Sequence, residues 1–352
     1  MWKALMWFLK WIKLAESSIS VDKSDTLPLE SQNQVEPEKS QVASIDFDKN
    51  FMQLVLSVNV FTDVAPSRFE QAVLEQLDEL LLSSSLDNNI LPRLPAVVPQ
   101  LLSSLKSDDS SGKLLAEQIG RDPVLVGEVI KLANSPSYYQ NNQKINSLQR
   151  AVIILGQSGL KRLIANVVMK PIFNVQDGYF GHLAKNYLWA QSECCAHACS
   201  FLAKNRYDTF DAYLAGMAIN IGMIVTVRIL DQMHKGRETP RSMTFYTMVL
   251  SKSRQLSVRI AENWRFPAPV LDALAEQTDM NGHPDLSSFG GIVYAANRIS
   301  QLHVLVKEGR VSDNIDLLTY SLGQQNYDRH LRCYAELKRI SSLDSKQNAK
   351  YV

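Results

Sequence analysis

The sequence lacks an excess of charge of either sign. Its 352 residues hold 37 lysines and arginines against 36 aspartates and glutamates, which leaves a formal net charge of +1. Binding of nucleic acid depends on basic side chains that neutralise phosphates, and long-range attraction of an acidic partner needs a similar field. The near balance therefore gives no reason to expect a nucleic-acid partner. An apolar share of 45% is ample for a buried core.

Cysteine is scarce, and its spacing is not that of a disulfide framework. Cys194, Cys195 and Cys199 lie close together, and Cys333 is remote. This usage fits a reducing compartment, so a cytoplasmic location is expected. Together with His197 the first three look like a zinc cluster. On a helix, however, Cys195 and Cys199 share one face while Cys194 and His197 share another. Core packing is the preferred interpretation, and no metal or other cofactor is expected.

Long alternating strand patterns and glycine-rich phosphate loops are missing as well. Capping residues, helical periodicity and helix-ending residues follow one another instead, which predicts an all-α fold. Ser67 and Glu70 have the spacing of a capping box, and the helix after Ser67 has a predicted core face of Phe69, Val73, Leu77, Leu80 and Leu81. Helices are expected from near residue 47, from 67, and over 95–106, 111–119, 122–134, 147–156, 158–173, 180–204, 208–233, 242–250, 253–264, 269–277, 287–307 and 327–340.

The N-terminus reads MWKALMWFLKWIKL over residues 1–14. On a helix its lysines share one narrow face, and the remainder is aromatic and aliphatic. The segment is too short to cross a hydrocarbon core of about 30 Å, and lysines interrupt the apolar run that a signal peptide needs. We expect an amphipathic helix lying on the inner membrane surface, and docking on the protein's own core or on a partner is the alternative. The candidate membrane anchor comprises Trp2, Lys3, Trp7, Phe8, Lys10, Trp11 and Lys13.

Three stretches together resemble one known family. The first contains LPRLP (residues 91–95), IGRDPVL (119–125) and LANSPSYY (132–139); the second is SLQRAVIILG (147–156); the third runs from LWAQS (188–192) to AGMAINIG (215–222). Their order and spacing resemble the HDOD family, the HD-related output domain of bacterial signalling proteins. The resemblance implies a helical bundle related to the HD phosphohydrolases and used as an output or interaction module.

The resemblance also divides the chain. We expect an amphipathic helix over residues 1–15, a disordered polar linker over 16–45, a helical segment over 46–90, the HDOD domain over 91–308 and a C-terminal helical extension over 309–352.

The HD metal site is implied to be degenerate. HD enzymes hold a divalent ion through a first histidine, an adjacent His-Asp pair and a later aspartate, and the ion lowers the pKa of its bound water. The resemblance places the pair at Ile219 and Asn220, the first histidine at or next to Gln191, and the later aspartate at Asn297. Isoleucine has no donor atom, and a neutral amide is a poor substitute for a carboxylate. We interpret Asn220 as a buried polar residue whose hydrogen-bond partners are Gln191 and Asn297.

Two surface features are candidates for binding. The loop after residue 133 offers Asn134, Ser135, Tyr138 and Tyr139 as a protein contact surface. Arg150, Lys161, Arg162 and Lys170 form a modest basic patch. A solvated helix face is the preferred interpretation of the patch, and a site for an anionic partner or a second-messenger nucleotide is the alternative.

These observations favour a non-catalytic regulatory module of bacterial signal transduction that works by binding another signalling protein. Two alternatives stay open. One is a metal-dependent HD-type phosphohydrolase or phosphodiesterase that acts on nucleotides or cyclic nucleotides. The other is a sensor that binds a small molecule in the emptied pocket.

Overall fold

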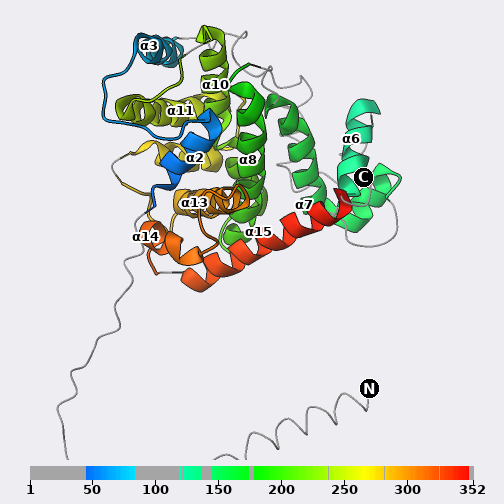
Figure 1. The fold of residues 1–352 in the computed structure, drawn as a ribbon. Helices are drawn as coiled ribbons and strands as arrows, with labels where there is room; N and C mark the ends of the chain where they lie inside the picture. Colours follow the sequence, from blue (N-terminus) through cyan, green and yellow to red (C-terminus); the bar gives the residue numbers. More distant parts are fainter. Residues whose placement is uncertain are drawn as a thin grey trace, which may run out of the picture. The chain divides into compact units, whose positions relative to one another are not determined.

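A computed structural model describes residues 45–83, 119–120, 123–135, 145–173, 178–236, 238–280, 282–324 and 326–348. Every regular element in these ranges is a helix (Figure 1), which confirms the all-α prediction. The candidate membrane anchor lies outside the described residues, as do Tyr138, Tyr139 and the helices expected over 95–106 and, apart from its last residue, 111–119.

The α-helices that the structure describes are α2 (Phe47–Leu56), α3 (Arg68–Leu82), α6 (Pro123–Ala133), α7 (Leu148–Met169), α8 (Gly181–Ala203), α9 (Thr209–Ala218), α10 (Ile221–Met233), α11 (Met243–Asn263), α12 (Ala268–Ala275), α13 (Phe289–Lys307), α14 (Thr319–Leu322) and α15 (Tyr327–Asn348). Short 3-10 helices are η1 (Lys170–Phe173), η2 (Glu276–Thr278) and η3 (Ile315–Leu318).

The core forms around α8, which packs against α9 and α13, while α10 packs against α11. Within the stretch Thr209–Met233, an 18-residue window has a mean hydropathy of 1.7 and is, by length and composition, apolar enough to cross a membrane. In the fold, 89% of that apolar window is buried by other helices. Its composition is therefore accounted for by a central position in the bundle.

The predicted helix over 208–233 is wrong in one respect, because it is broken at Ile219 and Asn220 into α9 and α10. A residue of α11 holds the break: Ser257 Oγ donates to the Ile219 carbonyl at 3.1 Å and accepts from the Gly222 N–H at 2.9 Å. Gly222 lies so close to α11 that an added Cβ would stand 1.9 Å from the carbonyl oxygen of Ser253. Tertiary contact thus interrupts a stretch whose local sequence is uniformly helical.

Two other predicted boundaries differ from the structure. The helices expected over 147–156 and 158–173 form one element, α7, with a kink at Gly156, whose φ of 66° is readily adopted by glycine. The helices expected over 242–250 and 253–264 form the continuous α11. Ser253 does not start a helix there, because its hydroxyl bonds to Thr226 Oγ on α10 at 2.8 Å.

The capping box at the start of α3 is confirmed, with Ser67 and Glu70 bonded reciprocally. The predicted core face of α3 needs correction, because Phe69 and Leu81 are only half-buried while Glu70 is buried. Glu70 Oε1 also accepts the backbone N–H groups of Arg241 and Ser242 at 2.8 and 2.9 Å. One carboxylate therefore caps α3 and ties it to the segment that leads into α11.

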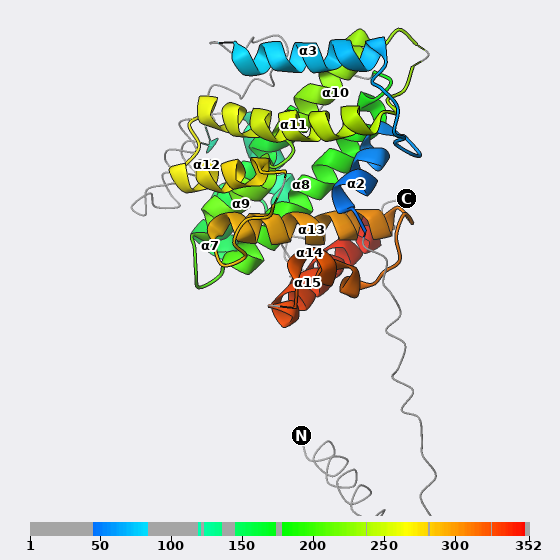
Figure 2. The ribbon, with the colours of Figure 1, turned by 90° about the vertical axis from the view of Figure 1, so that its left-hand side faces the viewer.

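Helix α2 lies between α11 and α13 and contacts α8 (Figure 2). Its inward face is apolar and includes Phe51, Met52 and Val55, all at most 6% exposed. Asp46 caps its first turn by accepting the Lys49 N–H at 2.9 Å. This helix precedes the segment that carries the HDOD resemblance, yet it is part of the same core.

Candidate functional site

The positions expected to hold the degenerate HD site lie together at the break between α9 and α10. Gln191 on α8 is fully buried, and its side-chain nitrogen donates to Asn297 Oδ1 at 2.6 Å and to Ser300 Oγ at 2.8 Å. Its side-chain oxygen accepts from Asn220 Nδ2, which also donates to Ser192 Oγ at 2.9 Å. Gln191 thus joins Asn220 to Asn297. Of the two partners expected for Asn220, Gln191 bonds to it directly, whereas Asn297 is reached through Gln191, and Asn220 itself is half-buried. We call these five residues the amide network.

Ile219 contributes no polar side chain to this arrangement. Its side chain, 9% exposed, lines a small cavity beside the amide network, and its carbonyl oxygen accepts from Ser257. At the position where the resemblance implies a histidine ligand, the structure therefore offers hydrocarbon.

The cavity has a volume of about 40 Å³. A single water occupies about 30 Å³ of liquid, whereas pockets for ordinary ligands measure about 300–1,000 Å³. The lining residues are Asp48, Phe51, Met52, Val55, Ile219, Asn220, Met223, Leu250, Ser253, Arg254, Asn297 and Gln301. Helix α2 supplies the first four, so it closes the cavity to anything much larger than water.

A buried ion-pair cluster borders the same cavity. Asp48 Oδ2 on α2 lies 2.6 Å from Arg254 Nη2 on α11 and 2.6 Å from Arg298 Nη2 on α13. Asp48 Oδ1 accepts from Gln301 Nε2 at 3.0 Å, and Gln301 Oε1 in turn accepts from Arg298 Nη1 at 2.9 Å. The Arg298 guanidinium also lies 4.8 Å from the centre of the Tyr294 ring.

The charge states in this cluster follow from competition between burial and ion pairing. Burial alone would raise the pKa of Asp48, but Arg298 and Arg254 together hold that pKa well below its ordinary value. Burial would likewise lower the pKa of Arg298, but Asp48 raises it above its ordinary value. All three side chains are therefore charged at neutral pH, and the cluster carries one more positive than negative charge.

The donor set does not fit a divalent metal ion. The amides of Gln191, Asn220 and Asn297 are bonded within the amide network, and Asp48, the one carboxylate at the cavity, is paired with two guanidinium groups. A cation there would face Arg254 and Arg298, whose repulsion is strong in a poorly solvated site. Across the described ranges, no three His, Cys, Asp or Glu side chains are grouped so as to hold a metal.

Sequence analysis missed Asp48, Arg254, Arg298 and Gln301. The sequence feature that could have indicated them is a charged residue among apolar ones. Arg298 lies in a run of buried residues of α13, and Asp48 lies in α2, which has six buried apolar residues. Charged side chains at such positions are rarely buried unless they are paired. Their pairing across the chain has no signature in a single sequence.

The cysteine and histidine group lies elsewhere on α8 and does not converge. Cys195 Sγ and Cys199 Sγ are 4.0 Å apart, while His197 stands edge-on to the Tyr213 ring at 5.7 Å. Burial raises the pKa of the Cys199 thiol and, with Arg162 nearby, lowers the pKa of His197 to about 4. Neutral, packed side chains agree with the core interpretation.

The predicted contact loop has a structural role at its first residue. Asn134 Oδ1 accepts from the Ile145 N–H at 2.8 Å, and Asn134 Nδ2 donates to the carbonyl oxygens of Ile145 and Ile130, both at 2.7 Å. Asn134 therefore holds the two ends of the loop together. Ser135 follows it and is half-buried.

The predicted basic patch is divided among several contacts. The Lys161 amine lies 5.8 Å from the Phe210 ring centre, and the Lys170 amine lies 5.7 Å from the Trp189 ring centre. Lys161 and Arg162 are half-buried, Lys170 is exposed, and Arg150 lies on the other side of the kink in α7. Two of the four cations thus stack on aromatic rings of the bundle.

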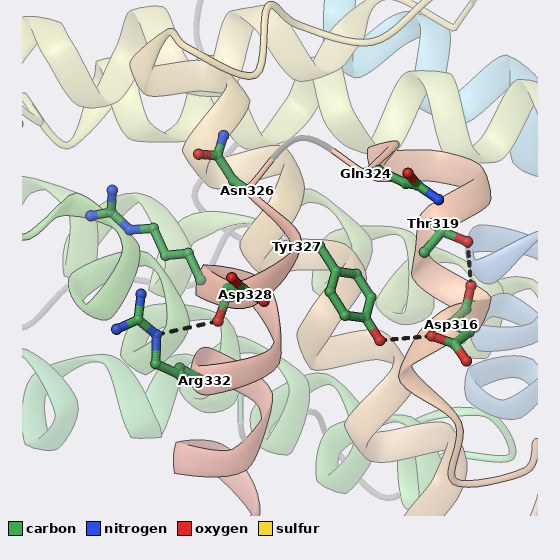
Figure 3. Close-up of a pocket in the computed structure, with 8 residues that line it drawn as sticks. Asp316, Thr319, Gln324, Asn326, Tyr327, Asp328 and Arg332 are labelled. Carbon is green, nitrogen blue, oxygen red and sulfur yellow. Dashed lines mark hydrogen bonds between the residues drawn. The ribbon is translucent and has the colours of Figure 1, made fainter. Parts of the chain in front are cut away.

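A larger recess of about 710 Å³ lies where α15 begins, and we call it the C-terminal pocket (Figure 3). Tyr327 Oη donates to Asp316 Oδ1 at 2.7 Å across it, and Arg329 donates to the Leu202 carbonyl at 2.7 Å. Its walls are polar and carry both signs of charge, and Asp316 and Asp328 are exposed. None of its lining residues belongs to the amide network.

Several solved structures have a fold similar to that of this chain. A crystal structure of an HDOD domain protein of unknown function from Geobacter sulfurreducens is 20% identical, with a TM-score of 0.56 over 78% of this chain and 97% of that one. A "Putative phosphohydrolase" from Shewanella amazonensis is 21% identical, with a TM-score of 0.52 over 76% and 94%. A "Putative signal transduction protein" from Marinobacter aquaeolei is 18% identical, with a TM-score of 0.53 over 78% and 66%. At these identities the likeness shows the fold.

Sequence comparison gives distant relatives and a family. The chain spans less than half the length of the curated relatives it matches. An uncharacterized protein of Treponema pallidum is 20% identical over 240 residues, which is 65% of this chain and 44% of that protein. The sequence model of the HDOD domain matches residues 91–280, more than half of the chain. The chain therefore belongs to the HDOD domain family.

Proposed function

We propose that this protein is a non-catalytic regulatory module of signal transduction that acts by binding another signalling protein. The observation that carries the proposal is the chemistry of the positions that the HDOD resemblance aligns with the HD ligands. These are Gln191, Ile219, Asn220 and Asn297, and they supply an isoleucine and amides bonded to one another in place of imidazole and carboxylate groups. Such a network fixes packing without an ion.

The proposal excludes the activity of a metal-dependent phosphohydrolase, although two similar structures are named "Putative phosphohydrolase" and "Putative metal-dependent phosphohydrolase". The test uses purified full-length protein equilibrated with Mn²⁺, followed by elemental analysis of bound metal. We expect much less than one ion per chain. A stoichiometric ion whose binding is lost in Asn220→Leu or Asn297→Leu would overturn the proposal.

Activity gives a second readout. We expect no hydrolysis of cyclic dinucleotides or of bis(p-nitrophenyl) phosphate above a buffer blank, with or without Mn²⁺, while a purified HD phosphodiesterase serves as the positive control. Turnover that follows the protein through purification and disappears in Asn220→Leu would establish an enzyme.

We also propose that residues 1–14 hold the module against the inner membrane, because their lysines and aromatic residues suit an interfacial helix. Full-length protein and a variant lacking these residues would be compared by fractionation of the native cell. The full-length protein is expected in the membrane fraction, from which high salt or carbonate releases it, and the shortened one in the soluble fraction. Equal distribution of the two would refute the anchor.

A protein partner would be sought by affinity capture with the same pair of proteins. Binding must then be reproduced between the two purified proteins. The folded Asn220→Leu variant should bind the partner with the same affinity as the wild type. Failure of every captured candidate to bind when purified would count against an adaptor role.

A further inference from the structure

Helix α2, which lines the small cavity beside the amide network, carries a charged group into the core. Asp48 is the one acidic residue of α2, and its side chain is 11% exposed between α11 and α13. It lies outside the segment that the family model matches, residues 91–280. Arg254 on α11, by contrast, lies within that segment, and Arg298 lies beyond its end on α13. One partner of the cluster thus comes from the N-terminal segment and the others from the body of the bundle.

The groups that receive Asp48 form an oriented donor set for an oxyanion. Two guanidinium nitrogens meet one carboxylate oxygen at 2.6 Å each, and the Gln301 amide meets the other at 3.0 Å. Gln301 is turned toward Asp48 because its own oxygen accepts from Arg298. Paired guanidinium groups are the side chains that best recognise carboxylate and phosphate. We call Arg254, Arg298 and Gln301 the guanidinium site.

This site is more than a balanced ion pair. The two arginines carry two positive charges against the single negative charge of Asp48, and their side chains are only 15% and 9% exposed. The shared cavity of about 40 Å³ reaches from Arg254 and Gln301 to the amide groups of Asn220 and Asn297. Unbalanced positive charge therefore lies beside the carboxylate, and a doubly charged oxyanion would balance it more completely than Asp48 does.

We propose that the guanidinium site binds oxyanions, that Asp48 is its internal occupant in this conformation, and that a phosphate- or carboxylate-bearing ligand and α2 compete for it. Displacement of Asp48 would free α2 and open the cavity between α11 and α13. This proposal does not depend on the adaptor role. The adaptor role is argued from the amide network and Ile219, whereas the guanidinium site consists of Arg254, Arg298 and Gln301.

Chemical rescue tests the site directly. In Asp48→Ala the guanidinium groups lose their anion, so the variant is expected to melt below the wild type. Added inorganic phosphate, in one arm, or formate, in the other, should raise its Tm saturably at constant ionic strength. The gain should be about 2–4 °C at roughly five times the Kd. Chloride at the same ionic strength is the reference.

The matched control is Asp48→Ala combined with Arg254→Gln, which removes half of the site. We expect this double variant to respond to phosphate and formate no more than to chloride. An equal response of single and double variants would overturn the proposal and leave the cluster a structural ion pair. Preference for phosphate over formate would identify a phosphate ester as the ligand class, and the reverse would identify a carboxylate.

Competition is measured on the wild type, so the test survives if Asp48→Ala does not fold. Amide hydrogen exchange of residues 47–56 should accelerate as phosphate is raised at constant ionic strength, while exchange in the middle of α8 stays unchanged. In Asp48→Asn, which keeps the shape but loses the charge, the same segment should exchange faster before any phosphate is added. Exchange of residues 47–56 that is insensitive both to phosphate and to Asp48→Asn would refute competition.

Discussion

The Oδ2 atom of Asp48 lies 2.6 Å from a guanidinium nitrogen of Arg298, a residue 250 positions further along the chain. The first described helix, α2, is thereby joined to α13 by a charged contact. Because the contact is shielded from water, it has a measurable dependence on pH.

Stability should depend on Asp48 in acid. The folded pKa of Asp48 lies well below its ordinary value, so its contribution is complete above the unfolded pKa of about 4 and is lost as pH falls toward the folded pKa. Asp48→Asn is expected to cost about 3–5 kcal/mol at pH 7. Urea unfolding of the two proteins should show this difference to be constant above about pH 5 and smaller below about pH 4. The exposed Asp63→Asn serves as the control, with a difference that stays near zero.

Two histidines, the half-buried His197 and the buried His303, should affect stability at higher pH than Asp48 does. Burial lowers the pKa values of His197 and His303 to about 4, whereas an unfolded histidine titrates near 6.5. The unfolded chain therefore binds protons first, and stability should fall as pH drops from about 7 toward 4. His197→Leu should flatten this slope, measured as urea midpoints at pH 7, 6 and 5. A slope unchanged by His197→Leu, or equally changed by the exposed His182→Leu, would contradict the assignment.

The amide network should be costly to break at its centre. Gln191→Leu keeps much of the volume but leaves Asn220, Asn297 and Ser300 without their shared partner. Each unsatisfied buried group costs about 1–3 kcal/mol, and partial rearrangement brings the expected total to about 2–4 kcal/mol. Chemical denaturation measures this loss, and the exposed Gln255→Leu on α11 should stay within about 0.5 kcal/mol of the wild type. If Gln191→Leu left the free energy of unfolding unchanged, the hydrogen bonds of Gln191 would make no net contribution to stability.

Two glycine substitutions should have opposite effects. Gly222→Ala would place a Cβ 1.9 Å from the Ser253 carbonyl oxygen and push α10 away from α11, so we expect a loss of about 3 kcal/mol or more. Gly127 on α6 has no neighbour within 4 Å of an added Cβ, and Gly127→Ala should gain about 0.5–1 kcal/mol through helix propensity. Thermal melts of the two variants decide the matter, and equal shifts would show that close approach at Gly222 is not required.

Local chemistry made much of the fold predictable. The capping box of Ser67 and Glu70 depends on residues three apart, and the amphipathic period of α3 is visible in its own fifteen residues. The HDOD resemblance also predicted that Gln191, Asn220 and Asn297 lie near one another, and in the structure hydrogen bonds join them. Their role as a former metal position stays a prediction.

Features decided by tertiary contact were not predictable. Asn220 is the one polar side chain in the apolar stretch over residues 214–225, and the hydroxyl of Ser257, 38 residues away from Ile219, bonds to the backbone on both sides of the break. No local sequence pattern around Asp48 predicts its contacts with Arg254 and Arg298. Both cases involve a single polar side chain whose partner lies on another helix.

The position of α2 also bears on where this domain can be cut. A fragment that begins at residue 91, where the family match starts, would lose six buried side chains of α2 and leave two arginines facing solvent across an apolar groove. The compact unit instead includes α2. Truncation at the family boundary is therefore expected to yield an aggregating polypeptide, and a soluble recombinant fragment should start before α2.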